Sequence, residues 1–398
     1  MIGARPLATR LDNNPILTSA DVPPSLPQLQ VESVFNPAAA RVGPETVLLL
    51  RVGESARCPE RVSRGDQMLD ISGPGERLYA AVEGTRGEEL IGVTYLNTQS
   101  TPPTPAVAYL RRDLPGLDLS DPRTIRYHSA DAGMNLAGQS RDYLTQMSHL
   151  RVARSTDGAH FAVDEAAAVW ADNELEAYGC EDPRATLIDG VWHVTYVSVG
   201  RLGITTSRLT TTDFRKFERQ GVMFLPDHKD VALFPERIKG RYAALTRPMP
   251  QSFGRVLGMW IAYSHDLVHW GDHRPLALPR PGCWDDIRTG ASTVPFRVEE
   301  GWLELYHGVD LRSRYALGGL LLDADDPSRV IARSDQPILV PTEAYERNGL
   351  FNDTVFSCGH VPLGDDGERI RVYYGAADSC VAAADFYVRQ IVEQLTPC

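Results

Sequence analysis

The sequence lacks the long apolar segments and the basic charge that would indicate a membrane or nucleic-acid-binding protein. No apolar run approaches the roughly 18 residues that span a bilayer, and the polar, proline-rich segment 1–25 has no apolar core typical of a signal peptide. Acidic residues outnumber basic residues 52 to 40, so the formal net charge is −12. Because this average charge repels polyanions, we expect no nucleic-acid partner and no membrane partner. A site for a small anion would have to be built locally from basic residues.

The sequence also lacks the spacings of common metal and nucleophile motifs. Its six cysteines are scattered without a CxxC pair, which indicates reduced, mostly buried thiols in a cytoplasmic protein. There is no HExxH, no GxxxxGKS/T and no GxSxG sequence. We therefore predict no metal and no organic cofactor.

Strand-like segments dominate, and helical periodicity is scarce. The clearest 3.6-residue pattern is in 385–395, near the end of the chain. Short segments rich in β-branched and aromatic residues, bounded by turn residues, occur at 47–52, 192–199, 242–246, 302–309 and 369–376. This pattern predicts an all-β fold with a short C-terminal helix.

A second pattern repeats along the chain, in which Ser or Thr stands two residues before an Asp and an aromatic residue four after it. The aspartates are Asp157, Asp213 and Asp266, so they advance by 56 and then 53 residues. We interpret each as an Asx-turn whose carboxylate accepts backbone N–H groups while the aromatic ring packs between sheets.

Repeats of this length built from short strands are typical of a β-propeller. The chain accommodates about five of them, which predicts a five-bladed propeller over 34–384. An extended lead, 1–33, would pack on the propeller, and a helix and tail, 385–398, would follow it. We expect one blade within 53–150, where the motif copies are poorer. The ligand site of a propeller lies at the axis, so its residues should come from distant parts of the sequence.

The densest polar segment, 178–190, contains Asp182 and Arg184. If the segment is extended, these two side chains share one face and Glu181 points to the other. An Asp–Arg pair that braces a strand explains the segment as well as a catalytic acid does. An adjacent arginine also lowers the pKa of an aspartate, which disfavours a general acid unless that arginine is occupied elsewhere.

Basic residues are scattered over three later segments. Lys229 and Arg247 lie beside apolar turns, and Arg288 precedes a glycine and small residues, as expected where backbone approaches a ligand. His307 ends an apolar strand, where a structural hydrogen bond is the simpler explanation. If propeller blades bring these residues together, they suit a small oxyanion such as phosphate or a carboxylate.

Two further carboxylates belong to the candidate set. Asp378 follows an aromatic–glycine pattern that an Asx-turn also explains, and Glu236 lies in a segment that reads as a solvated loop. Carboxylates and aromatic residues around a polar funnel suit sugar hydroxyls.

With these segments in hand, the sequence resembles glycoside hydrolase family 130, the β-mannoside phosphorylases and β-mannosidases. The resemblance covers nearly the whole chain and implies a five-bladed propeller. It is carried, in order, by NPILT (14–18), VFNPAAARVGPETVLLLRV (34–52), SHLRVARSTDGAHF (148–161), YGCEDPR (178–184), KDVALFPERIKGRY (229–242), YHGV (306–309), YALGGLLLDADDPSRVIARSDQPIL (315–339) and YYGAADSCVAAA (373–384).

The resemblance implies a role for each candidate residue. Asp182 of the EDPR motif would be the general acid, acting through a hydroxyl of the mannose. Asn36 and Arg51 would line the sugar site, and Asp378 would hold mannose hydroxyls at the −1 subsite. The residues that match the phosphate-binding positions are Lys229, Arg247, Arg288 and His307.

The family contains two chemistries, which differ in the nucleophile. An inverting hydrolase needs a second carboxylate to activate water, roughly 6.5–9.5 Å from the acid, whereas a phosphorylase needs cations to hold phosphate. Because the matched positions are basic here, we favour inverting phosphorolysis of β-1,2- or β-1,4-mannosides to α-mannose 1-phosphate, with an oligosaccharide and inorganic phosphate as the substrates. The alternatives are an inverting β-mannosidase with Glu236 as its base, and a non-catalytic sugar-binding propeller. The sequence leaves homo-oligomer formation open.

Overall fold

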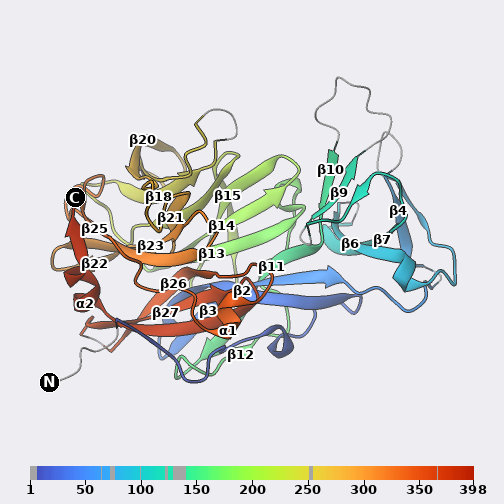
Figure 1. Ribbon diagram of the computed structural model, residues 1–398, viewed down its shortest axis with the longest axis horizontal. Helices are drawn as coiled ribbons and strands as arrows, with labels where there is room; N and C mark the ends of the chain where they lie inside the picture. Colours follow the sequence, from blue (N-terminus) through green and yellow to red (C-terminus); the bar gives the residue numbers. More distant parts are fainter. Residues whose placement is uncertain are drawn as a thin grey trace.

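The computed structural model describes residues 7–63, 65–71, 77–98, 100–121, 124–128, 140–250, 254–364 and 366–398 (Figure 1). These residues form 29 strands and only two short α-helices, α1 (Ala344–Arg347) and α2 (Val388–Glu393). The predicted all-β fold is therefore confirmed. No helix in these ranges has the length and hydropathy needed to cross a membrane.

The largest sheet has eight strands, which fall into two groups of four. One group contains β2 (Leu29–Val42), β3 (Glu45–Ala56), β11 (Gln146–Ser155) and β12 (Ala162–Val163). The groups are joined by one parallel pair, Ser148 with Gly179, whereas the strands within each group are antiparallel. The second group contains β13 (Gly179–Ile188), β14 (Val191–Gly200), β15 (Gly203–Thr211) and β16 (Glu218–Phe224).

Three further sheets complete the main body, and both ends of the chain pair into them. The N-terminal strand β1 (Ala8–Arg10) pairs with β28, and the C-terminal strand β29 (Leu395–Pro397) pairs with β25. The sheets contain β17 (His228–Leu233), β18 (Tyr242–Pro248), β19 (Met259–Ser264) and β20 (Trp270–Ala277); β21 (Arg288–Ala291), β22 (Phe296–Val298), β23 (Gly301–Val309), β24 (Tyr315–Leu322) and β25 (Val330–Ser334); and β26 (Val355–Leu363), β27 (Arg369–Ala376) and β28 (Cys380–Tyr387).

The segment between β3 and β11 forms a separate lobe at the side of the main body (Figure 1). β3 pairs directly with β11, so the lobe is an insertion between two neighbouring strands of one sheet. The prediction of a propeller blade within 53–150 is therefore wrong. The lobe has a small core of its own, since Val93, Leu110 and Ile125 belong to one apolar cluster formed by lobe residues. Its two sheets contain β4 (Gln67–Asp70), β5 (Arg77–Ala80), β6 (Leu90–Asn97) and β7 (Thr104–Arg111), and β8 (Leu117–Asp118), β9 (Thr124–His128) and β10 (Ser140–Leu144).

The three Asx-turns are present, as the repeat predicts. Asp157 Oδ1 accepts the N–H groups of Ala159 and His160 at 2.8 and 2.9 Å, and the other two aspartates make the corresponding bonds. In the first copy the aromatic residue, Phe161, packs edge-to-face on Tyr373 of β27 at 5.7 Å. These turns therefore fix hairpin ends and dock one sheet on the next.

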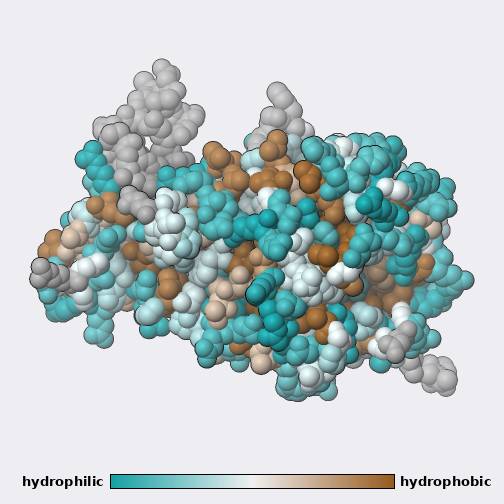
Figure 2. Space-filling model, turned by 180° about the vertical axis from the view of Figure 1, so that it is seen from behind, coloured by the Kyte–Doolittle hydropathy of each residue, from teal (hydrophilic) through white to brown (hydrophobic). Residues whose placement is uncertain are grey.

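Two details of the chain differ from the expectations. Asp385–Tyr387 continue β28, and only Val388–Glu393 are helical, because Phe386 alternates into the core beneath the sheet. The cysteines within the described ranges are free, but only three are buried, and Cys58, Cys283 and Cys398 are exposed. The surface seen from behind is mostly hydrophilic, with apolar residues exposed in small groups (Figure 2).

Candidate active site

Three polar side chains stand at equivalent points of three strands. β2, β13 and β17 each contain a β-bulge where the register with the neighbouring strand shifts. The residues at these bulges, Asn36, Asp182 and Asp230, have φ values of 44°, 47° and 56°. Asn and Asp tolerate this left-handed conformation better than most residues, and a bulge redirects the side chain. All three line one cavity.

This cavity, of about 220 Å³, contains eight of the nine residues predicted for the site. They come from β2, β3, β13, β17, β18, β21 and β23 and from the turn between β27 and β28. The structure thus brings eight residues from distant parts of the chain to one cavity: Asn36, Arg51, Asp182, Lys229, Arg247, Arg288, His307 and Asp378.

Asp182 is only 3% exposed and is held by two donors through the same oxygen. Asn36 Nδ2 and Arg51 Nη1 each donate to Asp182 Oδ1 at 2.9 Å. Burial alone raises the pKa of Asp182, but the charges of Arg51 and Lys229 outweigh it and leave the pKa below its usual value. The carboxyl is therefore ionised at neutral pH among these protein groups.

Arg184 is not the partner of the Asp182 carboxylate. Its guanidinium donates to the backbone carbonyls of Asp182, Ala291 and Ser292 and lies 3.4 Å from Asp230. The bulge at Asp182 breaks the simple alternation that would have paired the two side chains. Arg184 thus braces β13 against the end of β21.

Asp378 is the one carboxyl of the cavity whose pKa is raised, to about 6. Burial is the main cause; Arg51 opposes it, and the nearby charges of Asp182 and Glu181 add to it. Asp378 follows Ala377 in the turn after β27, with a positive φ of 51°. A half-buried carboxyl with a raised pKa is suited to bind hydroxyl groups of a sugar.

Asp230 is fully buried among cations and was not among the predicted site residues. Arg247 Nε donates to Asp230 Oδ2 at 2.6 Å, and His307 Nε2 lies 3.5 Å from the same oxygen. Burial raises the pKa of Asp230, but Arg247 and His307 lower it well below the usual range. Asp230 therefore stays ionised and fixes the two basic residues.

Several donors of the basic residues are buried and unsatisfied. Within the described ranges, Arg247 Nη1, Arg288 Nε and His307 Nε2 are buried and have no hydrogen-bond partner. Buried polar groups are normally paired, so this convergence indicates a missing acceptor. Burial and the arginine charges lower the pKa of His307 to about 3, so the ring is neutral and one nitrogen can donate.

Glu236 does not lie among these residues, so the hydrolase base inferred for it is not supported. Its side chain is 50% exposed and pairs with Arg297 Nε at 2.7 Å. The segment after β17 turns outward here, and the solvated-loop interpretation is the one that the structure favours.

The cavity also has walls that the sequence reasoning missed. Tyr315 accepts a hydrogen bond from Arg288, and Phe351 and Phe356 face the cavity with Thr354. Tyr315 begins β24, Phe351 and Thr354 precede β26, and Phe356 lies within β26. Beyond the aromatic character of three of them, their sequence carries no signal. Aromatic faces beside carboxylates suit a sugar ring.

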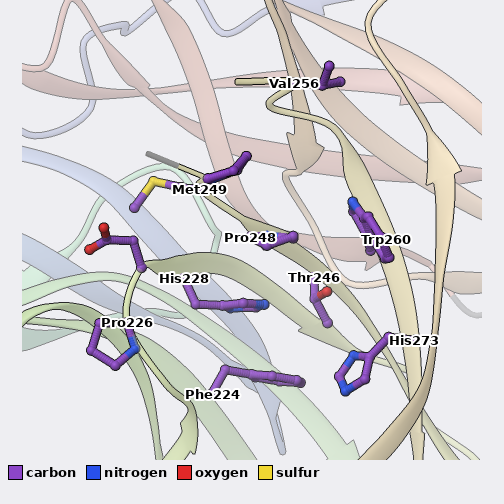
Figure 3. Close-up of a pocket in the computed structure, with 11 residues that line it drawn as sticks. Phe224, Pro226, His228, Thr246, Pro248, Met249, Val256, Trp260 and His273 are labelled. Atoms are coloured by element: carbon purple, nitrogen blue, oxygen red, sulfur yellow. The ribbon is translucent and has the colours of Figure 1, made fainter. Parts of the chain in front are cut away.

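A larger cavity of about 700 Å³ lies between β16 and the sheet of β17–β20 (Figure 3). Phe224 and His228 stack there with ring centroids 4.3 Å apart, opposite Trp260 and Met249. Its one lining carboxylate, Asp227, accepts the N–H of Ile204. Its described lining residues include no lysine or arginine, so this cavity is less suited to binding an anion than the smaller one.

Comparison with known proteins agrees with this geometry. A sequence model of the family described as beta-1,4-mannooligosaccharide phosphorylase matches residues 136–396. The beta-1,2-mannobiose phosphorylase of Listeria innocua is 39% identical over 386 residues, which cover 97% of this chain and 98% of the relative. The 1,2-beta-oligomannan phosphorylase of Thermoanaerobacter sp. is 36% identical over 64% of this chain and 83% of its own length.

The solved structures give the same result. The Listeria innocua beta-1,2-mannobiose phosphorylase in complex with beta-1,2-mannobiose superposes with a TM-score of 0.81 at 37% identity, over 98% of this chain and 99% of that chain. The likeness therefore includes the inserted lobe as well as the main body.

Proposed function

Because the chain belongs to glycoside hydrolase family 130, we propose that it phosphorolyses the β-mannosidic bond of short mannosides. The mannosyl group passes to inorganic phosphate with inversion, which gives α-mannose 1-phosphate and a shortened sugar. β-1,2-Mannobiose is the proposed substrate, since the relative named for it aligns with this chain over almost the full length of both.

One observation carries the phosphorolysis: buried donors of Arg247, Arg288 and His307 that lack partners converge on the cavity of Asp182. Lys229 adds a fourth basic group. A phosphate ion would accept from these donors, and charge-assisted bonds of this type are the stronger ones. Water as a nucleophile would need a carboxylate base instead.

The remaining cavity residues suit the mannosyl group. Asn36 Oδ1 is buried without a partner and can accept a hydroxyl, and Asp378 provides a second acceptor. In the reaction a phosphate oxygen forms a bond to C1 as the glycosidic C1–O bond breaks. The leaving oxygen takes a proton that originates from the carboxyl of Asp182, passed on by a mannose hydroxyl.

Phosphate binding also explains how Asp182 becomes an acid. The Lys229 charge helps to keep the pKa of Asp182 low. An anion on the basic residues neutralises part of this field, so the pKa of Asp182 rises when phosphate binds. Substrate cleavage is thereby tied to the presence of the nucleophile.

We also propose that the main body is a five-bladed propeller. The support is that the eight-stranded sheet divides at the single Ser148–Gly179 pair into two four-stranded units, beside three further sheets. The first strands of the five units, β2, β13, β17, β21 and β26, would then surround the axis.

Product analysis tests the function. The protein is incubated with β-1,2- and β-1,4-linked mannobiose, with and without phosphate, and the sugars are separated. We expect α-mannose 1-phosphate only with phosphate present. Mannose release at an equal rate in phosphate-free buffer would instead establish a hydrolase.

A further inference from the structure

A second cavity, slightly larger than the catalytic one, adjoins it. It has a volume of about 260 Å³ and shares Arg51 and Asp378 with the catalytic cavity, but none of the four phosphate-binding candidates. Its other walls are Phe35, Thr124, Leu144, Thr145, Gln146, Ser148, Glu181 and Leu350.

The inserted lobe contributes one wall of this cavity. Thr124 begins β9, Leu144 ends β10, and Thr145 connects β10 to β11. The direct pairing of β3 with β11, including Ser55 with Gln146, holds this edge of the lobe against the main body. Residues of the lobe thus reach the boundary of the catalytic cavity.

The direction of the reaction assigns an occupant to this cavity. In an inverting displacement the nucleophile and the leaving group lie on opposite sides of the reacting carbon. The basic residues mark the nucleophile's side, so the leaving sugar lies on the side of Arg51 and Asp378. A volume just below the range of pockets for drug-sized ligands suits one sugar ring.

Glu181 is the charged group that this cavity adds to the site. One of its carboxylate oxygens accepts from Arg51 Nη2 at 2.8 Å, and the side chain remains 14% exposed. Arg51 therefore links two adjacent carboxylates, since it also donates to Asp182. The apolar Leu144 and Leu350 and the hydroxyl of Thr124 match a pyranose ring, which has an apolar face and a polar edge.

We propose that Glu181 and Thr124 bind hydroxyl groups of the leaving mannose, which is the acceptor in the reverse reaction. This inference rests on the proposed function and names the residues that select its second sugar. The lobe between β3 and β11 is then part of the substrate site.

The reverse reaction separates the two sugars, because α-mannose 1-phosphate is the donor and mannose is the acceptor. We expect Glu181→Gln to raise the KM for mannose about tenfold, as a charge-assisted bond becomes a neutral one, and Thr124→Val to raise it about 2- to 10-fold. The KM for the donor should change less than twofold in both variants. Glu236→Gln, the same substitution at an exposed site, is the matched control.

Two results would overturn the inference. An unchanged KM for mannose in both variants would remove Glu181 and Thr124 from the acceptor site. A rise in the donor KM alone would show that Glu181 acts only by positioning Arg51. Failure of the wild-type protein to form any phosphate-dependent product would refute the proposed function instead, so the two failures are distinguishable.

Discussion

Substitution of Arg288 by glutamine tests the phosphate site with little cost to the fold. Within the described ranges, no carboxylate pairs with Arg288; its side chain donates to the Tyr315 hydroxyl and leaves Nε buried and unsatisfied. The variant therefore leaves no buried anion uncompensated. A hydrogen bond to a charged group contributes about 1.5–3 kcal/mol, so its loss predicts a rise of about 10- to 150-fold in the KM for phosphate.

The assay measures initial rates of β-1,2-mannobiose cleavage over a range of phosphate concentrations. The KM for mannobiose at saturating phosphate should change little, because Arg288 lies among the basic residues and not at Asp378. Arg274→Gln, at an exposed arginine that pairs with Asp272, is the control and should have wild-type constants. An unchanged phosphate KM in Arg288→Gln would refute the assignment of the basic residues.

Three further outcomes are expected. Asp182→Asn should lower kcat at least about 100-fold while mannobiose binding, measured by calorimetry, persists, because the acid is lost but its hydrogen-bonding shape is kept; wild-type turnover would exclude Asp182 as the acid. Glu236→Gln should leave kcat and stability unchanged. Arg247→Ala should abolish phosphate-dependent turnover and lower the free energy of unfolding in urea by about 3 kcal/mol, because it leaves Asp230 buried with fewer partners. Loss of turnover in Glu236→Gln but not in Arg247→Ala would favour hydrolysis. Burial lowers the pKa of His228 from 6.5 to about 3. As the pH falls from 6.5 toward 3, the unfolded chain therefore takes up a proton on this histidine that the folded chain does not, and the free energy of unfolding decreases. Between pH 7 and 5 this decrease should be less steep in His228→Gln than in the wild type, and an identical slope would contradict this.

The residue pattern alone predicted the all-β fold, the Asx-turns and the convergence of the site. Strand alternation and turn residues act locally, so they can be read from short windows. The lobe could not be placed in this way, because the pairing of β3 with β11 joins residues about one hundred positions apart. The sequence of the strand-like segments within 57–145 does not indicate which sheet they join.

The structure brings the predicted residues together, but their partners follow from the bulges and from the course of the chain. Asn36, Asp182 and Asp230 occupy equivalent bulges, but a bulge cannot be recognised from the sequence around Asp230, which was not assigned a role. Glu236 is a carboxylate, as a base must be, but its side chain points to solvent. This orientation depends on the course of the chain after β17, which the sequence does not show. For Asp182 the sequence left two interpretations open, and the bulge decides between them: Arg184 is occupied by backbone carbonyls, and the remote Arg51 pairs with the Asp182 carboxylate.

Phosphate dependence of β-1,2-mannobiose cleavage by the unmodified protein tests the central claim most directly. Turnover should rise with phosphate concentration to saturation and yield one α-mannose 1-phosphate for each mannose released. Mannose formed at the same rate without phosphate, and no sugar phosphate in its presence, would contradict the account.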